Sequence, residues 1–204
     1  MLLIRMVQLN QKKISLMSNF SNRIICWYKK NGRHELPWRK NISPYSIWIS
    51  EIMLQQTQVK TVIPYFNNFI EKYPNLEALL KASEDEILAQ WSGLGFYRRA
   101  KNIYKACRVV SEDFNNKLPA SIDDLESLPG IGRSTAGAIM SIAFNEGLPI
   151  LDANVKRVLG RYRKISFRTE NEKQKKLWLI SEKLTPHKES YEYTQGIMDL
   201  GCLL

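Results

Sequence analysis

The stretch Leu128–Ala136, which reads LPGIGRSTA, decides the fold expected for this chain. Gly130 and Gly132 lie two positions apart behind a proline, and glycine tolerates positive φ and close backbone approach. The pair therefore predicts a very tight turn between two short helices. N–H groups at the start of the second helix, with Arg133 beside them, favour phosphate binding over an ordinary helical hairpin. Such a contact positions a protein on nucleic acid without reading its bases.

The rest of the chain also has helical patterns, and no segment shows convincing period-2 alternation. Short loops between the segments are typical of a compact all-α protein. The sequence predicts helices at 19–31, 44–56, 59–70, 84–91, 97–113, 122–127, 133–145, 152–164, 172–184 and 190–203.

The composition is that of a soluble globular protein with an excess of basic residues. Of the 204 residues, 44% are apolar and 25% are charged, and the formal net charge is +10. This charge favours a polyanionic partner, with nucleic acid before a membrane surface. Basic residues gather at 98–108 and 156–176, and two such runs favour one basic face over ordinary solvated helices.

Targeting signals and cysteine pairs are both missing from the sequence. No apolar run is long enough for a membrane span or a secretory signal, so we expect a soluble, cytoplasmic protein. Cys26, Cys107 and Cys202 lie far apart and predict neither a disulfide framework nor a complete metal site. Residues 1–17 read as a disordered extension, within which Met6 or Met17 is an alternative start.

The segment ISEIMLQQTQV carries the first candidate for acid–base chemistry. Glu51 lies in the middle of an apolar helix, where partial burial would raise its pKa and make it a proton donor. Its spacing alone favours the simpler alternative, a carboxylate that faces solvent. Gln55, Gln56 and Thr57 follow at the helix exit, where amides and a hydroxyl can bond to base edges or backbone between the strands of a duplex.

Two other segments add candidates. In PILDANVKRV, Asp152 begins a helix, and its commonest use there is as an N-cap. The same carboxylate can also stabilise a developing cation beside a groove. In WSGLGFYRRAKN, Phe96 and Tyr97 stand beside arginines, a combination that suits stacking on bases with phosphate contacts. The alternative is that both rings join the core, and we expect one of the two to be exposed.

These segments, in this order, resemble the adenine DNA glycosylases (the MutY family) of the endonuclease III-like superfamily of helix-hairpin-helix DNA glycosylases. The resemblance covers about residues 19–201, and the combination is far more specific than any single glycine pair. It is carried by LPWR at 36–39, PYSIWISEIMLQQTQVKTVIPYF at 44–66, WSGLGFYRRAKN at 91–102, LPGIGRSTAGAIMS at 128–141, PILDANVKRVLGR at 149–161 and MDLG at 198–201.

The resemblance implies a role for each candidate residue. Glu51 would be the general acid that protonates the flipped adenine, and Asp152 would stabilise positive charge on the deoxyribose, with Asn154 nearby. The adenine pocket would be lined or supported by Arg33, Trp38 and Gln195. Contacts to the DNA would come from Gln55, Gln56, Thr57, Phe96, Gly130, Gly132, Arg133 and Ser134.

Ser134 separates the subfamilies. The resemblance places a lysine at this position in the bifunctional relatives, where it forms a Schiff base with the sugar and cuts the strand. A serine hydroxyl cannot form that imine, so the resemblance implies a glycosylase without strong lyase activity. Phe96 is a departure, because the family usually has tyrosine there, and the missing hydroxyl would loosen discrimination of the opposite base.

A second departure concerns the cofactor. The family carries a 4Fe–4S cluster on four cysteines that begin just past the position of Leu204, and then a domain that recognises 8-oxoguanine. The three scattered cysteines of this chain cannot form such a site, and Cys202 does not fall at a ligand position, so we expect no cluster and no metal here.

The sequence therefore predicts an all-α, two-lobed helix-hairpin-helix DNA glycosylase. A six-helix lobe at about 38–151 would contain the hairpin at 122–145, and 18–37 with 152–204 would form the second lobe, with DNA across the cleft between Glu51 and Asp152. The expected partner is duplex DNA with adenine opposite 8-oxoguanine or guanine, bound by a monomer in the cytoplasm at the nucleoid. The alternatives are a bifunctional oxidised-pyrimidine glycosylase with lyase activity and a catalytically impaired DNA-binding remnant.

Overall fold

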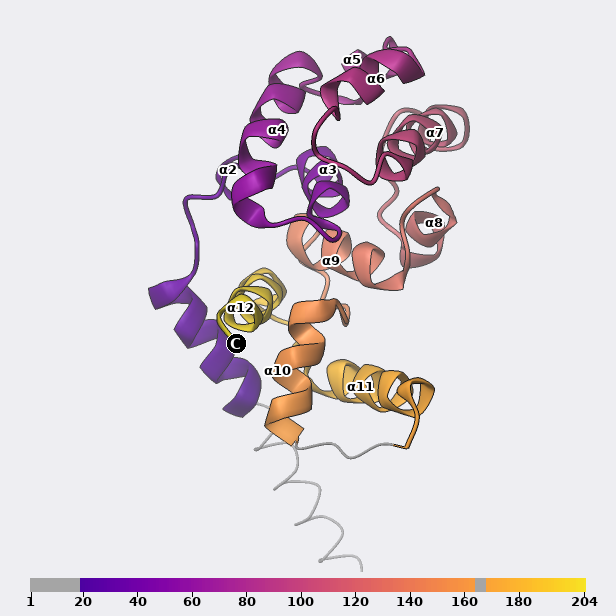
Figure 1. Ribbon diagram of the computed structural model, residues 1–204. Coiled ribbons are helices and arrows are strands. Elements are labelled where there is room, and N and C mark those ends of the chain that lie inside the picture. Colours follow the sequence, from indigo (N-terminus) through magenta and orange to yellow (C-terminus); the bar gives the residue numbers. More distant parts are fainter. Residues whose placement is uncertain (1–18, 164–167) are drawn as a thin grey trace, which may run out of the picture. The chain divides into compact units, whose positions relative to one another are not determined.

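The computed structural model describes residues 19–163 and 168–204, and the regular elements in these ranges are all helices (Figure 1). The all-α prediction is therefore confirmed. The predicted extension at 1–17 lies outside the described residues. None of the described helices is long and apolar enough to cross a membrane.

The chain divides into two compact units. One is His34–Phe144, and the other joins the chain up to Arg33 with Asn145–Leu204. The two boundaries between the units therefore lie at 33/34 and 144/145, a few residues before the predicted boundaries at 37/38 and 151/152. The connecting segment belongs to the second unit because Ser181 Oγ donates to the Ile150 carbonyl at 2.7 Å and Ser190 Oγ contacts Asn145 Oδ1 at 2.9 Å.

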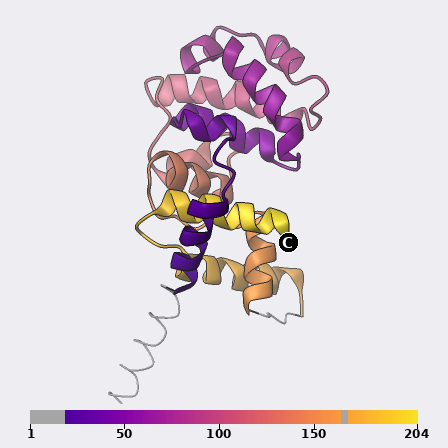
Figure 2. The same cartoon turned by 90° about the vertical axis from the view of Figure 1, so that its left-hand side faces the viewer.

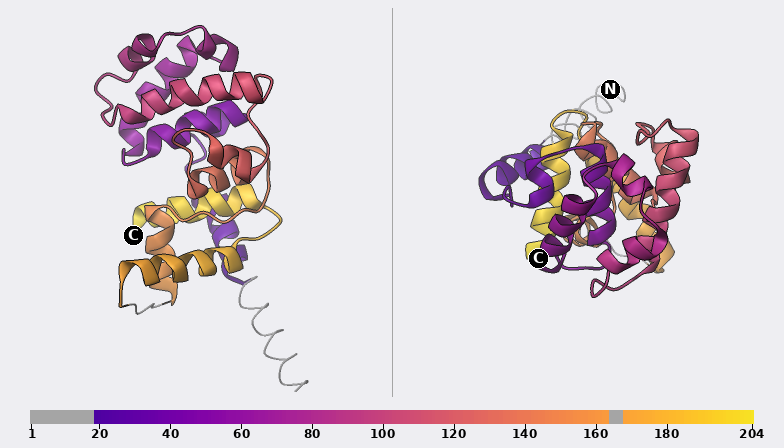
Figure 3. Two further views of the ribbon diagram at one scale, coloured as in Figure 1. Left: turned by 90° about the vertical axis from the view of Figure 1, so that its right-hand side faces the viewer. Right: turned by 90° about the horizontal axis from the view of Figure 1, so that it is seen from above.

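The unit His34–Phe144 is built around one central helix. Its helices are α2 (Pro37–Lys40), α3 (Pro44–Leu54), α4 (Val59–Lys72), α5 (Leu76–Leu80), α6 (Glu84–Gln90), α7 (Arg98–Asp113), α8 (Ile122–Ser127) and α9 (Arg133–Ala143). Helix α3 contacts α2, α4, α7 and α9, and Figure 3 shows α7 lying alongside it. It is apolar on nearly every side, as expected for a helix surrounded by others.

The start of α3 follows from local chemistry. The Ser43 hydroxyl accepts a hydrogen bond from the Ser46 N–H, the Ser46 side chain bonds back to the Ser43 N–H, and Pro44 occupies the first turn. This capping box satisfies N–H groups that the helix cannot satisfy itself. The predicted helix start at Pro44 is confirmed.

Two of the eight helices in this unit, α2 and α5, are missing from the six-helix prediction. Each spans only four or five residues, too few for apolar residues to recur with a helical period. Local signals were nevertheless present in the sequence. Pro37 begins α2, and the side chain of Asn75 accepts a hydrogen bond from the Ala78 N–H at the start of α5.

The second unit contains the helix at 19–31 with α10 (Ala153–Arg163), α11 (Glu170–Leu184) and α12 (Ser190–Leu203). Helix α12 packs against α10 and crosses the helix at 19–31 (Figure 2). The crossing is close because Gly196 has no side chain. A Cβ at this position would lie 2.8 Å from the Tyr28 Cβ and 3.0 Å from the Ile24 Cγ2.

Candidate active site and nucleic-acid interface

Glu51 lies on α3 at the edge of the core of its unit. Its neighbours Ser50 and Ile52 are each 1% exposed, whereas Glu51 itself is half-buried. Glu51 is therefore neither fully buried like its neighbours nor fully exposed on the surface of the helix.

Residues 55–58, here called the glutamine loop, follow directly from α3. Gln55 is the C-cap of that helix, and its side-chain amide donates to the Gly130 carbonyl and to the Thr135 hydroxyl, each at 3.4 Å. Gln56 is exposed and has a left-handed backbone, with φ of 58°. Thr57 is half-buried and donates to the Gln55 carbonyl. The loop thus presents Gln56 outward while Gln55 holds it to the hairpin.

Residues 93–97, here called the aromatic loop, present two rings to solvent. Phe96 is 56% exposed and Tyr97 is 46% exposed, so neither ring joins the core, and both rather than one are exposed. The reason is the backbone, because Gly93, Gly95 and Phe96 all have positive φ and turn both rings away from the core. Both loops contribute to one pocket, lined by Gln55, Gln56, Phe96, Tyr97, Arg98, Arg99 and Asn102.

The hairpin predicted from LPGIGRSTA is confirmed. Helix α8 ends at Ser127, the Ile131 N–H donates to the Leu128 carbonyl, and α9 begins at Arg133. Gly130 has φ of 86°, and a Cβ there would meet the Asn102 Cβ at 2.8 Å. Gly132 is different, since a Cβ there would lie in open space.

The first turn of α9 therefore faces an unobstructed approach. Gly132 is its N-cap, Arg133 is exposed, and Ser134 is half-buried. A helix start carries N–H groups without intrahelical acceptors and a partial positive charge. Together with the open side of Gly132 and the charge of Arg133, this arrangement is suited to a phosphate group.

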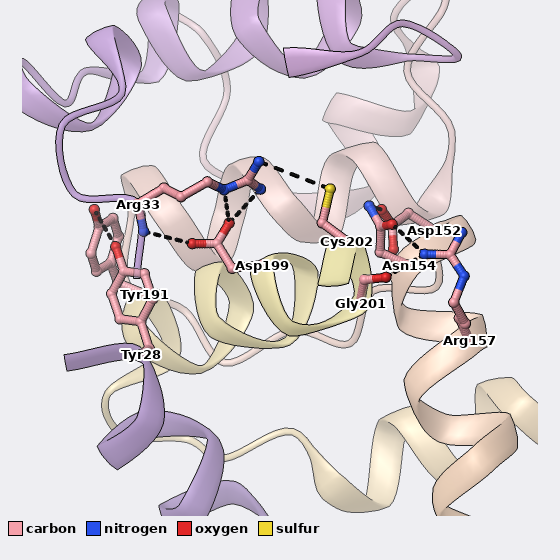
Figure 4. Close-up of polar contacts among 9 residues, drawn as sticks. All are labelled: Tyr28, Arg33, Asp152, Asn154, Arg157, Tyr191, Asp199, Gly201 and Cys202. Atoms are coloured by element: carbon pink, nitrogen blue, oxygen red, sulfur yellow. Dashed lines mark hydrogen bonds and ion pairs between the residues drawn. The ribbon is translucent and has the colours of Figure 1, made fainter. Parts of the chain in front are cut away.

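Asp152 caps α10 in the second unit (Figure 4). Its Oδ1 accepts from the Val155 N–H at 2.7 Å, as predicted for an N-cap, and its Oδ2 accepts from the Asn154 side chain at 3.2 Å. Desolvation by burial raises the pKa of Asp152 above its usual range, although these hydrogen bonds partly oppose the shift. The carboxylate is therefore a shielded group with its orientation fixed on two sides.

The orientation of Asn154 depends on a residue that sequence reasoning did not select. Arg157 donates through Nη1 to the Asn154 side-chain oxygen at 3.1 Å and to the Gly201 carbonyl (Figure 4). The glycine is required by packing, because a Cβ at 201 would lie 2.6 Å from the Asn154 Cβ. Arg157 thus connects the Asp152 site to the end of α12.

Arg33 belongs to an ion pair that the sequence did not reveal. Its main-chain N–H and its guanidinium donate to the Asp199 carboxylate at 2.6 to 3.0 Å, and Nη1 lies 3.9 Å from the Cys202 Sγ (Figure 4). Asp199 is only 2% exposed. An acidic residue inside the apolar segment MDLG was the available signal for such a partner. The contact joins the chain just after the helix at 19–31 to α12.

Trp38 and Gln195, the other two predicted pocket residues, are both buried. Trp38 lies on α2 and meets the Phe66 ring edge-on, with ring centroids 5.3 Å apart. Gln195 lies on α12 and is 2% exposed. They belong to different units.

The cysteines do not fit a metal cluster. Cys26 and Cys202 are exposed and Cys107 is buried on α7, in the other unit. In the described part of the chain, no three His, Cys, Asp or Glu side chains lie close enough to hold a metal ion. A 4Fe–4S cluster needs four thiolates around one centre, so these residues cannot provide its ligands.

The helices, the hairpin and the exposed loops define a helix-hairpin-helix protein built from two compact helical units. The chain belongs to the HhH-GPD superfamily of base excision DNA repair proteins, whose family model matches residues 49–183.

Relatives within this family are similar along nearly the whole chain. The adenine DNA glycosylase of Buchnera aphidicola subsp. Schizaphis graminum (strain Sg) is 52% identical over 186 residues, which cover 91% of this chain and 54% of that protein. The Homo sapiens protein of the same name is 36% identical over 201 residues, which cover 94% of this chain and 37% of that protein. The chain therefore spans about half the length of the first of these relatives, and less of the second.

A solved structure described as a thermostable thymine-DNA glycosylase has the same fold. It superposes with a TM-score of 0.80 at 29% sequence identity, over 96% of this chain and 88% of that chain.

Proposed function

We propose that this chain is a monofunctional DNA glycosylase that removes adenine opposite 8-oxoguanine or guanine in duplex DNA. The observation that carries the proposal is the 52% identity with an adenine DNA glycosylase over 91% of the chain. A stretch of 186 residues within a chain of 204 necessarily includes positions 51 and 152, so Glu51 and Asp152 both lie in the matched span. On this proposal the protein acts as a monomer on nucleoid DNA and its own cysteines hold no cluster.

The proposed reaction divides the work between two carboxyl groups. Glu51 protonates a ring nitrogen of the flipped adenine, so that the base leaves as a neutral molecule when its bond to the sugar breaks. Positive charge then develops on the deoxyribose, and the Asp152 carboxylate stabilises it. Water then adds its hydroxyl group to the sugar, and the proton that the water loses returns to the ionised Glu51, which regenerates the acid.

The surroundings of Asp152 support its part in this reaction. It must be ionised to stabilise a cation, and the hydrogen bonds from Val155 and Asn154 favour the ionised form against the desolvation that disfavours it. A partly desolvated anion also interacts more strongly with a nearby positive charge than an exposed one does. Asn154, held by Arg157, fixes the direction in which this carboxylate points.

The monofunctional character rests on Ser134. A lyase needs an amine that attacks the sugar carbon and forms an imine, and a hydroxyl cannot do so. Ser134 lies in the first turn of α9, next to the proposed phosphate contact at Gly132. We assign it to DNA contact, together with the hairpin and the glutamine and aromatic loops.

A single-turnover assay tests the proposal. Enzyme in excess over an A:8-oxoguanine duplex should produce abasic sites, which alkali converts to strand breaks. The Glu51→Gln variant should lower the excision rate by at least about 100-fold and still bind the duplex, because general acid catalysis contributes that order of rate. Glu71→Gln, at an exposed glutamate of α4, is the matched control and should excise at the wild-type rate.

The same assay separates the alternatives. Borohydride trapping on an oxidised-pyrimidine duplex would indicate the lyase class, and base release from a G:T duplex would indicate a thymine glycosylase instead. If wild type and Glu51→Gln bind equally and neither releases adenine, the chain is a DNA-binding remnant and the proposal is wrong.

A further inference from the structure

Arg99 is a buried residue of α7 whose guanidinium reaches the end of another helix. It is 6% exposed. Its Nη1 donates to the carbonyl oxygens of Ile52, Met53 and Gln55, at 3.2, 2.6 and 2.6 Å. The first two belong to the last turn of α3, where carbonyl groups lack the usual N–H donor from four residues further along the helix. The third begins the glutamine loop.

The other side of the same guanidinium holds the aromatic loop. Nη2 donates to the Gly95 carbonyl at 3.0 Å, and this carbonyl also accepts from the Trp91 indole at 3.1 Å. The guanidinium carbon lies 5.5 Å from the centroid of the Trp91 ring and 5.3 Å from that of Phe96. The planar group therefore contacts both aromatic rings while its edges bond to main chain.

Charge explains why an arginine is required here. Burial lowers the pKa of Arg99, because desolvation disfavours the charged form, yet a guanidinium stays protonated in proteins. The carbonyl ends of α3 carry partial negative charge and stabilise the buried cation. Lysine could carry the charge but lacks the planar fork that donates in several directions at once.

Both loops held by Arg99 have a strained residue at the tip. Gln56 has φ of 58° and Phe96 has φ of 51°, left-handed values that are costly for residues with side chains. Such conformations persist only where the surroundings enforce them. The bonds from Arg99 to Gln55 and Gly95 lie next to these two residues in the chain.

We infer that Arg99 is a positioning residue that joins the glutamine loop and the aromatic loop into one preorganised unit. Gln55 extends this unit to the hairpin through its bonds to Gly130 and Thr135. The inference builds on the proposed function, since on that proposal the two loops enter the DNA. Loops ordered in advance lose less conformational entropy on binding, so that Gln56 and Phe96 would act together rather than separately.

Hydrogen exchange in the free protein tests this inference independently of activity. The Thr57 N–H donates to the Leu54 carbonyl in one loop and the Leu94 N–H to the Trp91 carbonyl in the other. In wild type these two amides should exchange with the same opening free energy, as members of one cooperative unit. Arg99→Lys should speed exchange at both amides by a similar factor, of about tenfold or more, as expected when a shared local structure opens more easily.

The matched control is Arg108→Lys, on the same helix, where the guanidinium lies over the Tyr104 ring at 4.3 Å. It should leave exchange in both loops unchanged. Different opening free energies for the two loops in wild type would overturn the inference, and this measurement needs no variant to fold. Faster exchange in only one loop of Arg99→Lys would also overturn it.

Kinetics supply a second readout. With saturating enzyme on the A:8-oxoguanine duplex, Arg99→Lys should lower the single-turnover excision rate by about 10- to 100-fold, the scale expected when reacting groups are misplaced. Its affinity for undamaged duplex should change by less than about threefold, since phosphate contacts dominate that binding. An unchanged excision rate would overturn the inference. If wild type itself excises nothing, the proposed function fails, while the exchange result still decides the role of Arg99.

Discussion

At the scale of single residues, Asp152 has two roles, a structural one as a helix cap and a proposed chemical one in the reaction. As the N-cap of α10 it accepts a hydrogen bond from the Val155 N–H, and as a shielded carboxylate it is the proposed partner of a cation. The first use alone would be served as well by asparagine, which is an equally good N-cap. The two uses are therefore separable by one substitution.

Asp152→Asn should strongly reduce excision and change how the stability of the protein depends on pH. The pKa of Asp152 is raised in the folded protein, chiefly by desolvation, so its stabilising contribution is full below the usual aspartate pKa and is lost as the pH rises through the folded value. An amide has no charge to desolvate, so the stability of the variant relative to that of wild type should increase as the pH rises. Each kcal/mol gained would raise the melting temperature by about 2–4 °C.

Thermal unfolding from about pH 3.5, below the usual aspartate pKa, up to about pH 8 measures this difference. Single-turnover excision should fall by at least about 100-fold, as for loss of a charge-stabilising group. Asp113→Asn, at an exposed aspartate of α7, is the control and should show no such dependence on pH. A stability difference between the variant and wild type that stays constant across this pH range would contradict the assignment of a desolvated carboxylate.

At the scale of elements, the two glycines of the hairpin differ in what surrounds them: Gly130 is packed against another residue, and Gly132 is not. Gly130 needs its positive φ and has Asn102 against it, so internal structure excludes a side chain. Gly132 has an ordinary φ of –101°, and a Cβ there would meet nothing. Within the protein, only the modest preference for glycine at an N-cap acts on Gly132, and the proposed phosphate contact would add a second reason for a residue without a side chain.

Replacing each glycine with alanine separates folding from binding. Gly130→Ala should lower the free energy of unfolding by about 1–3 kcal/mol, because the left-handed conformation and the contact with Asn102 both become unfavourable. Gly132→Ala should cost less than about 1 kcal/mol, the usual difference between glycine and alanine at an N-cap.

Gly132→Ala should nevertheless weaken binding to undamaged duplex by about tenfold, as expected for one lost charge-assisted contact to phosphate. Urea unfolding and fluorescence anisotropy provide the two measurements. Equal losses of stability in the two variants, or wild-type affinity in Gly132→Ala, would contradict the phosphate assignment.

At the scale of the whole molecule, the net charge of +10 bears on every encounter with DNA. Charge of this size attracts a polyanion before any specific contact forms. The proposed specific contacts, at the hairpin and the two loops, are few and local by comparison. Non-specific affinity should therefore depend strongly on salt, and the chemical step should not.

Affinity for an undamaged duplex should fall at least about tenfold between about 50 and 200 mM salt, because each neutralised phosphate releases counterions. Anisotropy titrations at several salt concentrations give the slope. The excision rate with enzyme in saturating excess is the internal control and should vary by less than about threefold, since short contacts between buried groups are weakly screened. A flat affinity across this range would show that the basic residues are not the main contact with DNA.

Much of the fold could be predicted from the sequence because its causes are local. Helix periodicity, the capping box at Ser43 and the glycines of LPGIGRSTA are properties of neighbouring residues. The structure has these elements close to the predicted positions. Asp152 was found in the same way, since an N-cap is defined within four residues. The short helices α2 and α5 were missed because so few residues cannot show a period.

By itself, the sequence determined the helices, the hairpin and the positions of Glu51 and Asp152 within their elements. Tertiary structure alone decided which distant residues meet. Asp199 binds Arg33, and Arg99 bonds to the end of α3, although in each case the partners lie dozens of positions apart in the chain. A local pattern can indicate a buried charge, as the acidic residue in MDLG does, but it does not identify the partner, because a buried charge is stabilised by whichever groups the packing of helices brings to it.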